Sequence, residues 1–153
     1  GVERGKIDRE QVVALLKTLE DASRELEAGP ILDQLAEDAA ITIQLNGTQG
    51  NIKLHFDRKE YESYLKQGLA VTTSYVVEHA ERKITIAGDG QTAEVSEILL
   101  ERSTVGGKRL SCKSRQTARL GLRGGKLLIQ HLDADVLSIK QTANALKNEP
   151  FHN

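Results

Sequence analysis

The chain has 153 residues, enough for one domain with a sizeable core, and its 39% hydrophobic and 28% charged residues are typical of a folded globular protein. Its 21 basic and 22 acidic residues nearly cancel, which argues against a protein dedicated to nucleic acid or to a membrane surface. No apolar run reaches the roughly 20 residues of a transmembrane helix.

The single cysteine, Cys112, excludes an internal disulfide and a metal site built from several cysteines. It leaves the redox compartment open. Because the sequence contains no methionine at all, we expect a processed form, from which an export signal could have been removed. Localisation therefore stays unknown at this point.

The first predicted element is an amphipathic helix that begins after Asp8. Asp8 is a good N-cap, and Gln11, three residues later, completes a capping box. Apolar residues then recur at helical spacing. The pair Gly29-Pro30 should end this helix and start a short second one, with Pro30 in its first position. The apolar face of that second helix would be formed by Ile31, Leu32 and Leu35.

Residues 40–45 and 52–56 alternate between apolar and polar, which predicts a β-hairpin around Asn46-Gly47. Asn46 also begins a glycosylation sequon, but the turn is the better interpretation. A second capping box, Asp57 to Glu60, predicts a third helix with Tyr61 and Tyr64 on its buried side.

The second half of the chain predicts four long strands joined by glycine-containing turns, at residues 73–87, 92–103, 110–122 and 126–136. Such an order describes an antiparallel meander. Strands this long must coil or bulge, so we expect a strongly curved sheet. The last residues, 138–153, predict at most one short helix.

This order of elements resembles the nuclear transport factor 2-like superfamily, also called SnoaL-like. The resemblance lies in residues 35–41 (LAEDAAI), 84–95 (ITIAGDGQTAEV) and 125–133 (GKLLIQHLD), although the usual Trp of the last motif is Leu127 and its usual second His is Asp133. It implies an α+β fold in which N-terminal helices pack on a curved antiparallel sheet, forming a cone with an internal pocket. It covers one domain, residues 8–137, between an N-terminal tail (1–7) and a C-terminal tail (138–153).

Ketosteroid isomerase is a member of this superfamily, but its catalytic positions fall on apolar residues here. The catalytic Asp would lie near Ile43, and the tyrosine of the first helix near Leu15 or Leu16. We therefore do not expect that activity. In this superfamily some pockets catalyse and others only bind, so the fold alone sets no reaction.

Carrying the alternation of Ala93 and Val95 across the hairpins predicts which polar side chains face the pocket. The predicted inward set is Glu78, Arg82, Glu97, Cys112, Ser114, Gln116, His131 and Asp133. Unpaired buried charges are costly, so such a set indicates either paired groups or a wet cavity. Solvated strand ends are an equally good interpretation.

Within this set we expect His131 to be a candidate base, with Asp133 or Glu97 orienting it. The remaining candidates for ligand contact are Glu78, Arg82, Cys112, Ser114, Gln116 and the hydroxyl of Tyr64. Cys112 reads better as a small buried residue than as a nucleophile. No compact ligand spacing supports a metal site, so no metal is predicted. No other cofactor is predicted either.

Three functions remain open: a domain that binds an unknown small molecule, which leads; an enzyme of the isomerase or dehydratase type that transfers protons; and an interaction module that uses the sheet. A homodimer through the outer sheet face is expected, because four apolar residues alternate with the predicted pocket residues and would lie together on that outer face: Ile98, Leu100, Leu128 and Leu132. The basic stripe from Lys108 to Arg119 lacks interleaved aromatic residues, which favours a solvated face over a nucleic-acid site.

Overall fold

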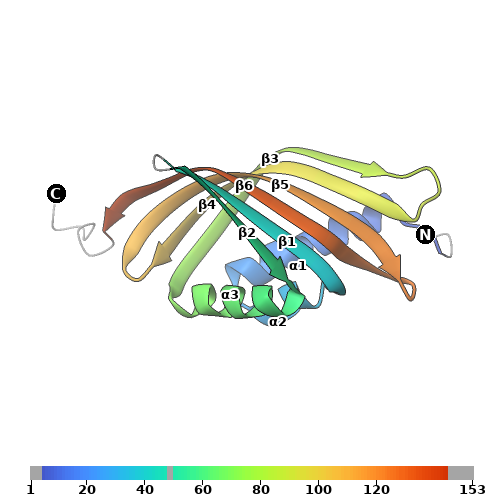
Figure 1. Cartoon of the computed structure of the whole chain (residues 1–153), viewed down its shortest axis with the longest axis horizontal. Helices are drawn as coiled ribbons and strands as arrows, with labels where there is room; N and C mark the ends of the chain where they lie inside the picture. The colour runs from blue at the N-terminus through green and yellow to red at the C-terminus, as the bar shows by residue number, and fades with distance from the viewer. Residues whose placement is uncertain (1–4, 48–49, 145–153) are drawn as a thin grey trace.

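The computed structural model describes residues 5–47 and 50–144. An arched six-stranded sheet covers three helices, which lie together against its concave side (Figure 1). The elements in chain order are α1 (Arg9–Arg24), α2 (Ala28–Leu32), β1 (Leu35–Gly47), β2 (Gly50–Asp57), α3 (Arg58–Ala70), β3 (Thr72–Ile86), β4 (Thr92–Val105), β5 (Lys108–Arg123) and β6 (Lys126–Asn144).

Both predicted capping boxes are confirmed, and they fix where α1 and α3 begin. The Asp8 carboxylate accepts a hydrogen bond from the backbone N–H of Gln11, whose side chain accepts one from the backbone N–H of Asp8, both at 2.9 Å. Asp57 and Glu60 repeat this arrangement at the start of α3. Each box satisfies N–H groups that a helix start would otherwise leave unpaired.

The predicted break between α1 and α2 is wrong in position. Helix α1 ends at Arg24, and Leu26 adopts a left-handed backbone conformation with φ of 58°. Helix α2 already begins at Ala28, so Pro30 is not its first residue. It ends at Leu32, and Leu35 starts strand β1 instead of extending the helix.

The sheet has the strand order β2-β1-β6-β5-β4-β3, and strands β3 to β6 form the expected antiparallel meander. Strand β1 pairs with β2 in the predicted hairpin but runs parallel to β6, so the sheet is mixed. The helices and the concave face bury one core, whose largest fully buried side chains are Ile41, Leu120, Ile129, Val12 and Val95. The α+β cone expected from the resemblance is thereby confirmed.

The C-terminal tail differs from the expectation over its first part. Residues 138–144 continue β6 and pair with β5, where Ser138 lies opposite Lys113, so this stretch is a strand and not a helix. This stretch forms a strand because it pairs with the neighbouring strand β5. The rest of the predicted tail helix, residues 145–153, lies outside the described residues.

A β-bulge in β6 reverses the predicted orientation of His131 and Asp133. The register against β5 shifts by one residue between two neighbouring pairs, Leu120↔Ile129 and Arg119↔His131. Since one extra residue flips the alternation of side chains, Leu132 faces the concave side while His131 and Asp133 are exposed on the outer face. The predicted inward orientation of these two side chains is wrong.

A second bulge, in β3, reverses the first half of that strand. The register against β4 shifts between Ala80 and Lys83, and Glu81 between them has φ of 53°. Arg82 stays on the concave side as predicted, but Glu78 is exposed on the other face. Tyr75 and Val77 take the inward positions instead.

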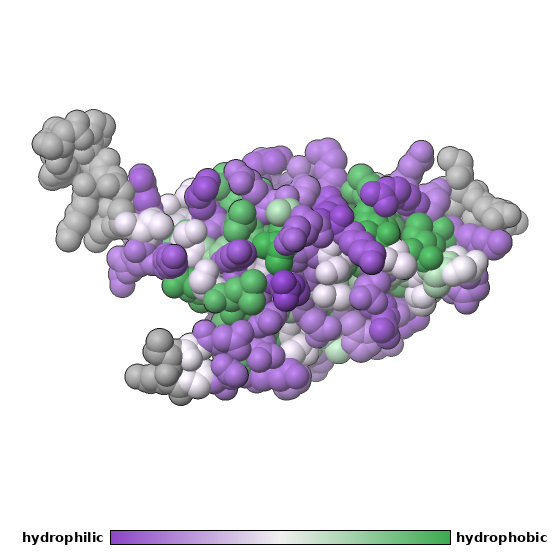
Figure 2. Space-filling view, turned by 90° about the horizontal axis from the view of Figure 1, so that it is seen from above, coloured by the Kyte–Doolittle hydropathy of each residue, from purple (hydrophilic) through white to green (hydrophobic). Residues whose placement is uncertain are grey.

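The outer face of the sheet is mostly hydrophilic, with separate hydrophobic areas between (Figure 2). Of the four residues predicted to form a dimer patch, Leu132 lines the pocket inside the cone, and Leu128 is partly buried against the core. Ile98 is buried, and Leu100 is 39% exposed. The apolar patch is therefore smaller than expected, and dimerisation stays a prediction. Separately, none of the helices in the described ranges has the length and apolar character needed to cross a membrane.

Candidate functional site

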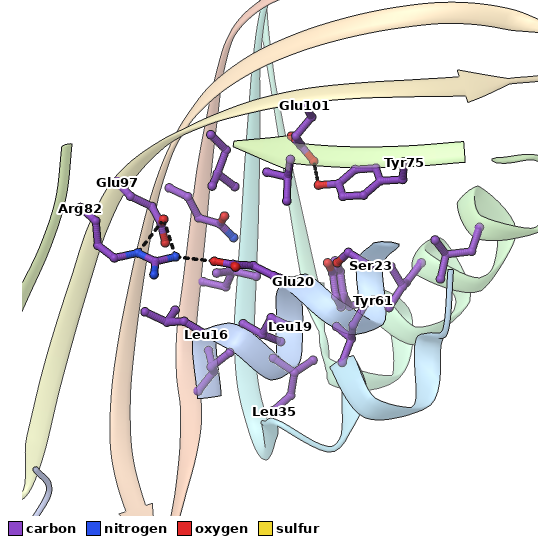
Figure 3. Close-up of a pocket in the computed structure, with 18 residues that line it drawn as sticks. Leu16, Leu19, Glu20, Ser23, Leu35, Tyr61, Tyr75, Arg82, Glu97 and Glu101 are labelled. Atoms are coloured by element: carbon purple, nitrogen blue, oxygen red, sulfur yellow. Dashed lines mark hydrogen bonds and ion pairs between the residues drawn. The ribbon is translucent and has the colours of Figure 1, made fainter. Parts of the chain in front are cut away.

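A pocket of about 240 Å³ lies between the helices and the concave face of the sheet (Figure 3). Side chains from all three helices and five of the strands line it. Most of the lining is apolar and consists of Leu16, Leu19, Ile31, Leu35, Leu65, Leu69, Val77, Leu99, Ile129 and Leu132. The same amphipathic stripes that build the core therefore also build this cavity.

A chain of charged groups occupies one side of the pocket. Arg82 of β3 donates from Nε and Nη2 to Oε1 of Glu97 at 3.1 and 3.0 Å, and Nη2 also reaches Oε1 of Glu20 on α1 at 2.7 Å. His79, which is not one of the lining residues, contacts the same Glu20 oxygen through Nε2 at 3.1 Å. The Glu97 side chain is 7% exposed and that of Arg82 21%, so this ion pair is largely withdrawn from water.

A second polar pair lies on the other side of the pocket, where the Tyr75 hydroxyl donates a hydrogen bond to Oε2 of Glu101 (Figure 3). Burial raises the pKa of Glu101, and the bond from Tyr75 only partly opposes this. Burial, together with the nearby Glu101 charge, also raises the pKa of Tyr75 far above its usual range. Cys112, opposite Glu101 on β5, has its pKa raised to about 11, chiefly by burial.

Tyr61 of α3 completes the lining beside this pair, and burial raises its pKa to about 12. Its ring packs against Phe56, with centroids 6.2 Å apart, as the staple predicts. Tyr64 was expected on the buried side of α3, but it is 45% exposed. Its ring stacks on Tyr61 and lies tilted against Phe56 outside the pocket, so its predicted ligand contact is not supported by its position.

The structure brings three of the predicted site residues into the pocket, namely Arg82, Glu97 and Gln116. Ser114 and Cys112 share the concave side of β5, as expected, but lie outside the lining. Glu78, His131 and Asp133 lie on the outer face of the sheet. There His131 and Asp133 lie in a shallow hollow beside Glu94, Thr117 and Arg119. The trio His131, Asp133 and Glu97 is thus split between the two faces of the sheet.

Sequence reasoning missed five polar groups of the site: Glu20, Ser23, Tyr61, Tyr75 and His79. Regular alternation along β3 would put Tyr75 and His79 on the face opposite to Arg82, and nothing in the sequence indicates the bulge at Glu81 that turns them inward. The alternation along β4 places Glu101 on the same inward face as Glu97, and the structure confirms this position, although Glu101 is not among the predicted site residues. Glu20 follows Leu19 and lies one helical turn after Leu16, so its place at the edge of the apolar stripe could have been recognised.

The polar groups of this pocket are suited to holding an organic molecule. They comprise carboxylates, a guanidinium, tyrosine and serine hydroxyls and an amide, all of which form hydrogen bonds. Across the two described ranges, no three His, Cys, Asp or Glu side chains converge in the manner of a metal site.

Comparison by sequence finds no matching family model and no matching curated protein. Comparison by structure finds clear likenesses. A candidate scytalone dehydratase from Novosphingobium aromaticivorans matches with a TM-score of 0.73 at 10% identity, covering 92% of this chain and 93% of that one. Hexachlorocyclohexane dehydrochlorinase LinA-type3 from Novosphingobium barchaimii matches with 0.69 at 12% identity, covering 88% and 90%.

An NTF2-like protein of unknown function from Pseudomonas putida matches with a TM-score of 0.66 at 15% identity, covering 86% of this chain and 89% of that one. At these identities the likeness concerns the fold and not the activity. The resemblance drawn from the three sequence motifs is confirmed at that level, and the chain has the NTF2-like fold.

Proposed function

We propose that this protein binds a small, mostly apolar organic molecule in the pocket inside the cone. Protein interiors are normally packed to the density of organic crystals, so an open cavity of about 240 Å³ departs from an ordinary core. It exceeds the roughly 150 Å³ apolar cavity that holds a benzene ring, so a single-ring molecule with a short polar side chain is of suitable size.

The observation that carries this proposal is the combination of an apolar wall with a few converging polar groups. Ligand sites have this composition because apolar surface supplies affinity and a few hydrogen-bonding groups supply orientation. Here the charged group around Arg82 and the pair formed by Tyr75 and Glu101 face one cavity (Figure 3).

Titration with 2-phenylethanol, followed by amide chemical shifts in NMR, tests the proposal. We expect saturable shifts at lining residues, and we expect Val77→Phe to abolish them because its ring fills the pocket. Val76→Phe is the matched control, since Val76 is the neighbouring residue on β3 but is 53% exposed. Equal binding by both variants, or shifts confined to the outer face, would contradict the proposal.

Proton-transfer catalysis in the same pocket is the second candidate function. Its support is the contact between His79 and Glu20, because a carboxylate can hold an imidazole in position as a base. The Glu101 carboxyl, with its raised pKa, could supply the acid. The dehydratase and dehydrochlorinase names of two structural neighbours point in the same direction. This pairing replaces the split trio around His131.

Deuterium incorporation next to the carbonyl of cyclohexanone, measured by NMR in D₂O, tests this second candidate. The wild type should accelerate exchange, His79→Asn should reduce it, and His131→Asn should leave it unchanged because His131 lies on the outer face. If exchange is no faster than in buffer, the protein does not abstract protons from such ketones, and ligand binding remains as the proposed function.

A further inference from the structure

The charged residues that line the pocket are unequal in sign: three are glutamates, and one is an arginine. The glutamates come from separate elements, Glu20 from α1 and both Glu97 and Glu101 from β4. We propose that the pocket selects small apolar amines, whose ammonium group binds against these carboxylates. The inference rests on the proposed function and narrows it to a ligand class.

The hydrogen bonds to the three carboxylates leave acceptor oxygens available. Both bonds from Arg82 to Glu97 reach Oε1, and the contacts of Arg82 and His79 with Glu20 also converge on a single oxygen. Tyr75 donates to Oε2 of Glu101. Among the described residues, no side chain or backbone group donates to the second oxygen of any of these three carboxylates.

Glu97 should gain most from a further hydrogen-bond donor, because its side chain is only 7% exposed and lies in the pocket wall. A carboxylate so far withdrawn from water is stabilised by every donor it gains. An ammonium group carries a positive charge and three N–H donors, whereas an alcohol supplies one donor and no charge. A carboxylate ligand would add a negative charge to an acidic wall.

Arg82 does not reverse this preference, because its positive charge is already shared between two carboxylates. Nη2 contacts Glu20 at 2.7 Å and Glu97 at 3.0 Å. The group of Arg82, Glu20 and Glu97 is thus acidic on balance even before Glu101 is considered. A bound ammonium would supply the cation that this group lacks.

Three probes with one ring and different head groups test the inference: 2-phenylethylamine, 2-phenylethanol and phenylacetate. Each is titrated at neutral pH, with the dissociation constant taken from amide shifts of lining residues. We expect the amine to bind at least about tenfold more tightly than phenylacetate, because like charges brought together in an enclosed site oppose binding. The alcohol should fall between them.

Glu97→Gln should remove most of the preference for the amine over the alcohol while leaving the affinity for the alcohol nearly unchanged. Glu94→Gln is the matched control, since Glu94 lies on the same strand but is exposed on the outer face. Should Glu97→Gln fail to fold, Glu101→Gln provides the same test, because its amide oxygen still accepts from Tyr75.

Equal affinity for the amine and the alcohol in the wild type would overturn this inference and leave the proposed function standing. Amine binding that survives Val77→Phe would also overturn it, since the ammonium would then bind elsewhere. If none of the three probes shifts the lining residues, both the inference and the proposed pocket function are wrong for molecules of this size.

Discussion

Arg82 and Glu97 form a bifurcated salt bridge inside the cone, with both donor nitrogens within 3.1 Å of one carboxylate oxygen. The pair joins neighbouring strands, β3 and β4, and Glu20 extends it to α1. It therefore connects the sheet to the helix layer at the position where the pocket interrupts the core. The contribution of this salt bridge to the free energy of unfolding can be measured.

Arg82→Gln should destabilise the protein by about 3 kcal/mol, because it leaves the buried Glu97 without a countercharge. Urea unfolding gives this value. The double variant Arg82→Gln/Glu97→Gln should recover part of the loss, since it removes the stranded charge. Arg123→Gln is the control: its pair with Asp38 is exposed, so its loss should stay below about 1 kcal/mol. Equal losses for the two single variants would contradict the buried role of Arg82.

Glu101→Gln should make the protein more stable at neutral pH. Burial raises the pKa of Glu101 in the folded state, so the folded protein binds this proton more tightly than the unfolded chain does. Stability from this group is therefore present at low pH and is lost as pH rises past the ordinary carboxyl range. The groups facing it are the Tyr75 hydroxyl, Cys112 and Tyr61.

The measurement is urea unfolding of both proteins from acidic to neutral pH. The two stability curves should converge at acidic pH and separate as pH rises, with the variant above the wild type. A variant less stable than the wild type at neutral pH would show that the Glu101 carboxylate is stabilised when ionised.

Leu132→Ala should cost about 2 kcal/mol, whereas His131→Ala should change stability by less than about 0.5 kcal/mol. The difference follows from the bulge in β6, which turns Leu132 toward the pocket and His131 toward solvent. Urea unfolding of the two neighbouring variants measures it. A larger loss of stability for His131→Ala than for Leu132→Ala would instead support the regular alternation of β6 that the sequence suggests.

Cys112 should react slowly with a disulfide reagent such as 5,5′-dithiobis(2-nitrobenzoate) in the folded protein. Burial raises its pKa from 9.0 to about 11, which reduces the reactive thiolate about 100-fold at mildly alkaline pH. In urea the thiol should react at the rate of a free cysteine. A fast reaction without urea would show an accessible thiol and reopen a chemical role for it.

The local signals of the sequence predicted much of the fold. Asp8 and Asp57 mark the helix starts because a capping box depends only on residues a few positions apart. The turns at Gly106-Gly107 and Gly124-Gly125 are equally local, since all four glycines adopt positive φ. The parallel pairing of β1 with β6 was not predicted, because it depends on contacts between residues far apart in the sequence.

The site was less predictable because it depends on register, and each bulge inverts the alternation of side chains beyond it, up to the next shift in register. Glu97 and Gln116 were placed correctly because β4 and β5 pair without a shift along their whole length. His131 lies beyond a bulge, and alternation carried through it gives the wrong face. Glu78 was misplaced for the same reason.

A crystal structure of the protein grown with 2-phenylethylamine would show directly whether the pocket binds an amine. We expect the ring between Leu19 and Leu99 on the apolar wall, with the amine nitrogen within hydrogen-bond distance, about 3 Å, of the Glu97 carboxylate. A pocket that stays empty at saturating amine, or an amine bound only on the outer face near Asp133, would contradict it.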